Sequence, residues 1–275
     1  MNTLKKGNKG DEVKILQTAL TKFGFNVTAD GDFGIKTETA VKNFQKSKGL
    51  VADGIVGTKT WNALNIKEEN NTKSVDASVL YSPLNVHVTK LANRPITYIA
   101  VHYTAGGSSK KGSALNVKKG FQARKASADF CVDDETMVQF NPDIKNYYCW
   151  SVGDKKYANT KGGSLYGKAT NKNTISIEMC SNLKKGLSSN AAAAANHDGW
   201  YLTDETIKQC AKLAKILMKK YNIPIERVVR HYDVSGKLCP GIIGWNDELT
   251  YTTDGKATKN YNNSAEWVKF KTLLK

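Results

Sequence analysis

Long apolar runs are absent from the 275-residue sequence, and this absence excludes one class of protein. A membrane-spanning helix needs about 18 or more consecutive apolar residues, and no such stretch occurs. The first residues, 1–7, lead directly into a polar stretch and lack the apolar core of an export signal. We therefore expect a protein that is made in the cytoplasm, spans no membrane and carries no evident signal peptide.

Acidic residues are scarce relative to basic ones. The sequence has 25 aspartates and glutamates but 41 lysines and arginines, which gives a formal net charge of +16. A charge of this size favours polyanionic partners such as nucleic acid, an anionic membrane or the anionic polymers of a bacterial wall. The basic residues are scattered in pairs, as at 118–119, 184–185 and 219–220, rather than massed in one tail or helix. This distribution argues against a dedicated nucleic-acid reader.

The five cysteines are an odd number and lack the spacing of a small disulfide framework. At least one is therefore unpaired, and a reduced protein fits the pattern better. Four of them have apolar neighbours in strand or helix patterns and are interpreted as core residues, although their pairing stays open: Cys131, Cys149, Cys180 and Cys210.

The length favours a small module joined to a larger domain. Residues 1–65 carry apolar residues at helical spacing in three segments and predict a small all-α module of three helices. Two similar turns, at 30–34 and 53–57, separate these helices, and each contains an Asp-Gly pair that permits a positive φ. Residues 66–82 are polar without a sustained period and predict a linker.

Residues 83–275 predict an α/β domain, in which helices flank a mixed central sheet. Strands are expected at 96–101, 130–132, 137–140 and 174–179, and an amphipathic helix is expected at 203–221. The last residues, 264–275, predict a helix docked on the core. An alanine-rich stretch at 191–195 reads as an inserted loop, and the nearby His197 is interpreted as a solvated loop residue.

Two distant segments carry residues typical of a metal site. His102 ends the apolar strand at 96–101, and the ends of strands frequently host functional sites. Far along the chain, His231 and Cys239 lie within one short loop segment. Lys237 and turn-forming residues near Cys239 favour its thiolate form over a buried, inert thiol. Two imidazoles and a thiolate make three ligands, the number that a catalytic zinc needs while a fourth position stays open.

The order of the motifs resembles a known family. Residues from about 95 to 241 resemble the zinc amidases related to bacteriophage lysozyme-amidases and peptidoglycan recognition proteins. The resemblance rests on Val101-His102-Tyr103-Thr104, Ala126-Ser127-Ala128-Asp129-Phe130, Asn173-Thr174-Ile175-Ser176-Ile177-Glu178, Arg230-His231-Tyr232-Asp233 and Lys237-Leu238-Cys239-Pro240-Gly241. The first sixty or so residues resemble a peptidoglycan-binding module of the PG-binding-1 type, because both of its Asp-Gly turns are present.

The resemblance implies a role for each site residue. His102, His231 and Cys239 would hold Zn²⁺, Glu178 would take a proton from the attacking water, and Lys237 would stabilise the tetrahedral intermediate. Some relatives use a tyrosine where this chain has Ala128, so that alternative mechanism is excluded and more depends on Glu178. Asp129 stands where relatives commonly have histidine, and its role is open, as is that of Asp233.

The implied activity is hydrolysis of the amide bond between N-acetylmuramic acid and L-alanine in bacterial peptidoglycan. A phage or prophage endolysin, which reaches the wall through a holin-type pore or on lysis, is expected in preference to a housekeeping autolysin. One alternative is a non-catalytic peptidoglycan-recognition protein, although such relatives usually lack the cysteine. Another is a glycosidase, but no pair of carboxylates stands out in the sequence.

Overall fold

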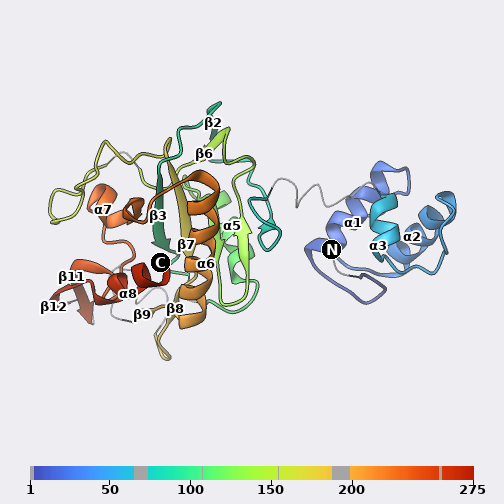
Figure 1. Cartoon of the computed structure of the whole chain (residues 1–275). Helices are drawn as coiled ribbons and strands as arrows, with labels where there is room; N and C mark the ends of the chain where they lie inside the picture. Colours follow the sequence, from blue (N-terminus) through green and yellow to red (C-terminus); the bar gives the residue numbers. More distant parts are fainter. Residues whose placement is uncertain (1–2, 65–73, 107, 154, 188–198, 254–255) are drawn as a thin grey trace. The chain divides into compact units, whose positions relative to one another are not determined.

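The computed structural model describes residues 3–64, 74–106, 108–153, 155–187, 199–253 and 256–275, with the backbone alone at 11 and 249–263. The chain divides into two compact units, 1–72 and 73–275, which are described separately (Figure 1). No helix of the described ranges combines the length and the apolar character needed to cross a bilayer.

The first unit is the three-helix module that the sequence predicts. Its helices are α1 (Asp11–Lys22), α2 (Ile35–Ser47) and α3 (Thr58–Ala63). They bury one apolar cluster, whose largest fully buried members are Leu16, Leu20, Phe33 and Phe44.

Two buried glutamines stabilise the two Asp-Gly turns in the same way. The side-chain oxygen of Gln17 accepts a hydrogen bond from the backbone N–H of Gly31 at 2.8 Å, and that of Gln45 accepts one from Gly54 at 2.9 Å. Both glycines have positive φ, 82° and 77°. The sequence showed the repeated turns but not these glutamines, because an isolated Gln in an amphipathic helix gives no sign of its partner.

The second unit contains most of the secondary structure. Its strands are β1 (Leu80–Tyr81), β2 (Val88–Lys90), β3 (Tyr98–Tyr103), β4 (Phe130–Val132), β5 (Met137–Gln139), β6 (Tyr147–Cys149), β7 (Thr174–Met179), β8 (Asn182–Leu183), β9 (Trp200–Tyr201), β10 (Val228–Arg230), β11 (Asn246–Thr253) and β12 (Lys256–Asn263). Its helices are α5 (Ser113–Ala123), α6 (Asp204–Tyr221), the 3-10 turn η1 (Ile225–Arg227), α7 (His231–Ser235) and α8 (Ala265–Leu273).

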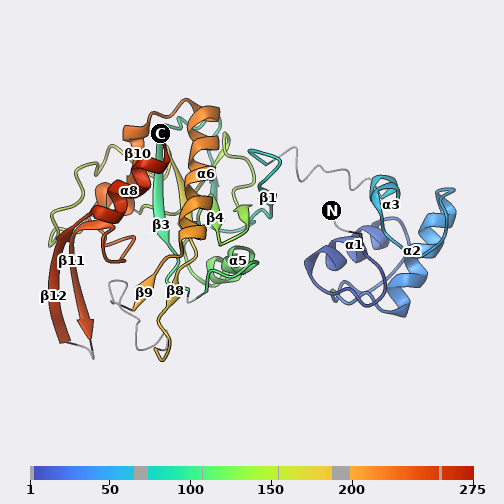
Figure 2. The same ribbon diagram turned by 60° about the horizontal axis from the view of Figure 1, so that its bottom comes forward.

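A six-stranded sheet in the order β1-β5-β4-β7-β3-β10 forms the centre of this unit. Strands β4, β7, β3 and β10 run parallel to one another. The β4–β5 pair is antiparallel, so the sheet is mixed. Helices α6 and α8 contribute to the apolar core on one face (Figures 1 and 2). Helices α5 and α7 contribute to two smaller clusters that contain residues of the opposite face. The predicted α/β class is confirmed.

Several features differ from the expectation or were not foreseen, among them strand β10, which lies in the central sheet. Residues 74–82 were expected to be linker, but Val75 and Val79 are buried in the core and β1 pairs with β5. The segment is mostly polar, so its composition gave no indication that these few apolar residues are buried. Helix α5 was not predicted, and neither was the hairpin of β11 and β12 within the segment before α8.

A buried ion pair connects β7 with the segments that precede β3 and β4. Nη1 of Arg94 donates to Oδ1 of Asp129 at 3.0 Å, and both side chains are fully buried. The other carboxylate oxygen of Asp129 accepts from the backbone N–H and the hydroxyl of Ser176, both at 2.9 Å. Arg94 also donates to the carbonyl oxygens of Lys172 and Thr174. Asp129 is therefore a structural residue that ties β4 to β7.

Replacing Asp129 tests this role. Asp129→Ala leaves the Arg94 guanidinium buried without its counter-ion, so we expect a loss of about 3–5 kcal/mol in the free energy of unfolding. Denaturant titration followed by circular dichroism measures the loss. The matched control is Glu205→Ala at an exposed site in the first turn of α6, where about 1 kcal/mol or less is expected. Equal stabilities for the two variants would show that Arg94 does not depend on Asp129.

Candidate metal centre and its cavity

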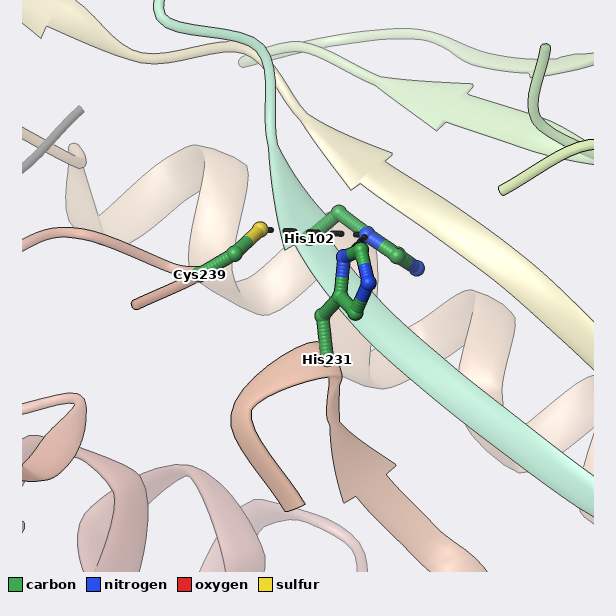
Figure 3. Close-up of side chains that lie close together, drawn as sticks. All are labelled: His102, His231 and Cys239. Atoms are coloured by element: carbon green, nitrogen blue, oxygen red, sulfur yellow. Dashed lines mark hydrogen bonds between the residues drawn. The ribbon is translucent and has the colours of Figure 1, made fainter. Parts of the chain in front are cut away.

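Three side chains from separate segments meet at one edge of the sheet (Figure 3). His102 belongs to β3, His231 is the first residue of α7, and Cys239 lies in the loop that follows. Nδ1 of His231 lies 3.1 Å from Nδ1 of His102, and Sγ of Cys239 lies 3.7 Å from the same Nδ1. All three side chains are buried, and within the described residues no other group of three such side chains is as close.

The parallel sheet explains why these residues come together. Strand β10 pairs with β3 so that Arg230, its last residue, lies opposite Val101. The residues that follow, His231 at the start of α7 and His102 in β3, therefore lie at the same edge of the sheet. Strand β7 pairs with β3 on its other side, with Glu178 opposite His102. Paired residues of parallel strands point to the same face. The sequence positions 102, 178 and 231 are therefore neighbours in space.

Two of the three separations between the donor atoms fit a zinc site, and all three donor atoms lie within 4.8 Å of one another. Tetrahedral zinc, bound by nitrogen at about 2.0–2.1 Å and by sulfur at about 2.3 Å, separates two nitrogens by about 3.3 Å and nitrogen from sulfur by about 3.6 Å. The separations of 3.1 and 3.7 Å are close to these values. The Val152 carbonyl oxygen lies 3.0 Å from Nε2 of His231 and can accept a hydrogen bond from an N–H there, which leaves Nδ1 of His231 free to act as a ligand.

Burial sets the protonation of the three candidate ligands. It lowers the pKa of His102 and lowers that of His231 to about 3, and the nearby positive charge of Lys237 adds to both shifts. Both imidazoles are therefore neutral at neutral pH, as metal ligands must be. Burial, with a smaller contribution from the charge of Glu178, raises the pKa of the Cys239 thiol to about 12 against the opposing charge of Lys237. A thiolate at this position thus needs a cation beside it.

Glu178 lies beside the three ligands on the same cavity. Burial raises the pKa of its carboxyl to about 8, against the opposing charges of Lys237 and Arg124. One carboxylate oxygen, Oε2, is buried and has no hydrogen-bond partner among the described residues. Thr174 and Ser176 share its face of β7, while Ile175 and Ile177 belong to the core on the other face. A poised carboxyl with a free oxygen can exchange protons with a ligand in the cavity.

The remaining residues singled out in the sequence fall into two groups. Lys237 lines the cavity, and its positive charge lowers the pKa values of four groups there. These are His102, Glu178, His231 and Cys239. Asp233 instead caps α7: its carboxylate accepts from the Arg230 backbone at 2.8 Å and pairs with the Arg230 guanidinium at 2.5 Å. Asp129 also lies away from the cavity, in the buried ion pair. His197 lies outside the described residues.

The cysteines expected in the core are all buried and free: Cys131, Cys149, Cys180 and Cys210. Sγ of Cys131 lies 3.6 Å from Sγ of Cys180, so these two are neighbours without a disulfide.

The cavity itself has a volume of about 690 Å³. Its walls include the three candidate ligands, Glu178 and Lys237, together with one face of α5 and Trp150. The α5 wall and Trp150 were missed from the sequence. The residues of α5 that line the cavity are spaced along one helical stripe, but their mixed polar, small and aromatic character gives no clear amphipathic signal.

Two family models match the chain. Residues 92–242 match the model described as "N-acetylmuramoyl-L-alanine amidase", and residues 9–64 match the one described as "Putative peptidoglycan binding domain".

Individual relatives match parts of the chain. It is 31% identical over 149 residues to N-acetylmuramoyl-L-alanine amidase CwlL of Bacillus licheniformis, covering 52% of this chain and 35% of the relative. It is 49% identical over 75 residues to the type VI secretion system spike protein VgrG3 of Vibrio cholerae, covering 22% of this chain and 7% of that protein. The chain thus spans about a third or less of these two relatives.

Among solved structures, the chain is similar to the catalytic domain of XlyA. The identity is 21%, the TM-score is 0.46, and the match covers 72% of this chain and 99% of that one.

Proposed function

Because the chain belongs to the N-acetylmuramoyl-L-alanine amidase family, we propose that it hydrolyses the bond between N-acetylmuramic acid and L-alanine in peptidoglycan. The observation that carries the proposal is the meeting of His102, His231 and Cys239 with Glu178 on one cavity of about 690 Å³. Water adds to the lactyl carbonyl, the C–N bond breaks, and the products are a carboxylic acid on the sugar and a free L-alanine amine.

His102, His231 and Cys239 are the residues that would hold zinc, since their donor types, burial and spacing fit it. Zinc bound there would polarise the carbonyl and lower the pKa of a water molecule to about 7. The chain's own residues keep both imidazoles neutral and place all three candidate ligands on the wall of the cavity.

Glu178 acts as the proton carrier. Its unpartnered Oε2 accepts the proton of the attacking water and returns it to the nitrogen of the departing L-alanine. Lys237 supplies a positive charge on the same cavity, where it stabilises the negative charge that develops on the former carbonyl oxygen.

The first unit is proposed to hold the enzyme on the wall. Residues 9–64 match a peptidoglycan-binding family, and the net charge of +16 adds attraction to anionic wall polymers. The module contributes local concentration, while the chemistry stays in the second unit.

Replacing Glu178 tests the activity and the acid-base role together. Glu178→Gln keeps the size of the side chain but cannot accept a proton, so we expect turnover to fall by roughly a hundredfold to ten-thousandfold. Purified peptidoglycan is digested, and mass spectrometry identifies the products. The wild-type enzyme should release stem peptides with a free L-alanine amine.

Metal content is recorded in the same preparations, because the variant should retain zinc. A zinc-loaded Glu178→Gln enzyme that runs at the wild-type rate would contradict the assignment of the proton carrier. Release of reducing sugars instead of stem peptides would contradict the proposed reaction.

Removing a ligand tests the metal centre. His102→Ala, His231→Ala and Cys239→Ser should each lower the zinc content well below about one ion per chain and abolish wall hydrolysis. The reason is that a site with three protein ligands loses much of its zinc affinity when one ligand is removed. Elemental analysis measures the content. His87→Ala and Cys210→Ser are matched controls, because these residues lie outside the candidate ligand set, and both should keep their zinc. Full occupancy in any ligand variant removes that residue from the set.

Deleting residues 1–72 tests the module. Cleavage of a soluble muropeptide should stay within about twofold of the full chain, whereas binding to whole walls should weaken by about tenfold or more. Co-sedimentation with purified walls measures the binding, and added salt should weaken it for both proteins. Equal wall binding with and without the module would argue against tethering.

A further inference from the structure

Helix α5 forms a wall of the cavity that the proposed chemistry does not use. Three polar or small residues of α5 line the cavity at helical spacing, and these are Ser113, Asn116 and Gly120, while Arg124 follows directly after the helix end at Ala123 with an extended backbone. Positions three, four and seven residues apart share one face of a helix. These three residues therefore form a stripe that faces the cavity, and Arg124, which also lines the cavity, lies just beyond the C-terminal end of the helix.

The guanidinium of Arg124 lies over this stripe. A Cβ atom built on Gly120 would lie 3.9 Å from Nη2 of Arg124, so the arginine folds back along the helix above the glycine. Arg124 lines the same cavity as Glu178 and Lys237. Arg124 is exposed, and no carboxylate of the described residues forms an ion pair with it.

The charges on the cavity walls are unbalanced. Arg124 and Lys237 are cationic, and Glu178 is the one acid among the lining residues that the structure describes. Glu178 is assigned to proton transfer, and Lys237 to the carbonyl oxygen. This leaves the Arg124 charge free to bind an anionic group of the substrate, and guanidinium binds carboxylates through paired hydrogen bonds.

Reach limits which carboxylate this can be. The second residue of a stem peptide is D-glutamate linked through its side chain, and its α-carboxylate is the first one beyond the scissile bond. One residue spans at most about 3.6 Å, so this group lies within roughly two residue lengths of the reacting atoms. Arg124, Glu178 and the three candidate ligands line one cavity of about 690 Å³, so a substrate bound at the ligands also extends toward Arg124.

We propose that Arg124 binds the free α-carboxylate of the second stem residue and so selects substrates in which this group is not amidated. The inference rests on the proposed amidase function. Arg124 could instead serve only to stabilise the C-terminal end of α5 through the helix dipole. That role would not require its side chain to line the cavity.

Two substrates that differ by one charge provide the test. One is N-acetylmuramoyl-L-alanyl-γ-D-glutamyl-L-lysine amide, and the other carries a carboxamide in place of the glutamate α-carboxylate. The wild-type enzyme should prefer the first by about tenfold in kcat/KM, because a partly exposed pair is weakened by solvent. Arg124→Gln should reduce this ratio to near one. Arg124→Lys, which keeps the charge but loses the fork, should retain part of it.

Lys119→Gln is the matched control. It removes one positive charge from the exposed side of the same helix, at a position that does not line the cavity, and should keep the wild-type ratio. A wild-type ratio near one, or an unchanged ratio in Arg124→Gln, overturns the inference while amidase activity stands. Failure to cleave either substrate at the muramoyl bond overturns the proposed function, and the inference with it.

Discussion

The parallel alignment of β7, β3 and β10 is the constraint on which the site depends. It places Glu178 beside His102 and brings His231 to the same sheet edge. A shift of one residue in either pairing would turn the affected side chains to the opposite face of the sheet. The buried Arg94–Asp129 pair supports this alignment, because Asp129 binds the backbone of Ser176 two residues before Glu178.

Burial then gives these residues their chemical character. The same desolvation lowers the pKa of both histidines, raises that of Glu178 to about 8 and raises that of Cys239 to about 12. Each shift favours the neutral form of its group. A metal ion bound in this pocket would supply the positive charge that stabilises the thiolate of Cys239.

The C-terminal segment supports the loop that carries two of the three candidate ligands. Arg230 precedes His231 and pairs with Asp233 and Asp247, at 2.5 and 3.0 Å. Its guanidinium also lies 5.4 Å from the centre of the Trp267 ring of α8. These contacts connect β10, α7, the start of β11 and α8, so residues beyond the matched range 92–242 help to hold the ligand loop.

Local patterns in the sequence determined the helices of the module, the strands β3, β4, β5 and β7 and the choice of three candidate ligands, since periodicity and short motifs depend on neighbouring residues. Glu178 and Lys237 followed from the same motifs. The tertiary structure alone decided that Asp129 is a buried structural partner of Arg94, that Asp233 caps α7, and that residues 74–82 join the core. It also decided that α5, with Arg124, lines the cavity. These roles arise from contacts between residues tens of positions apart or from burial, and no local pattern records them.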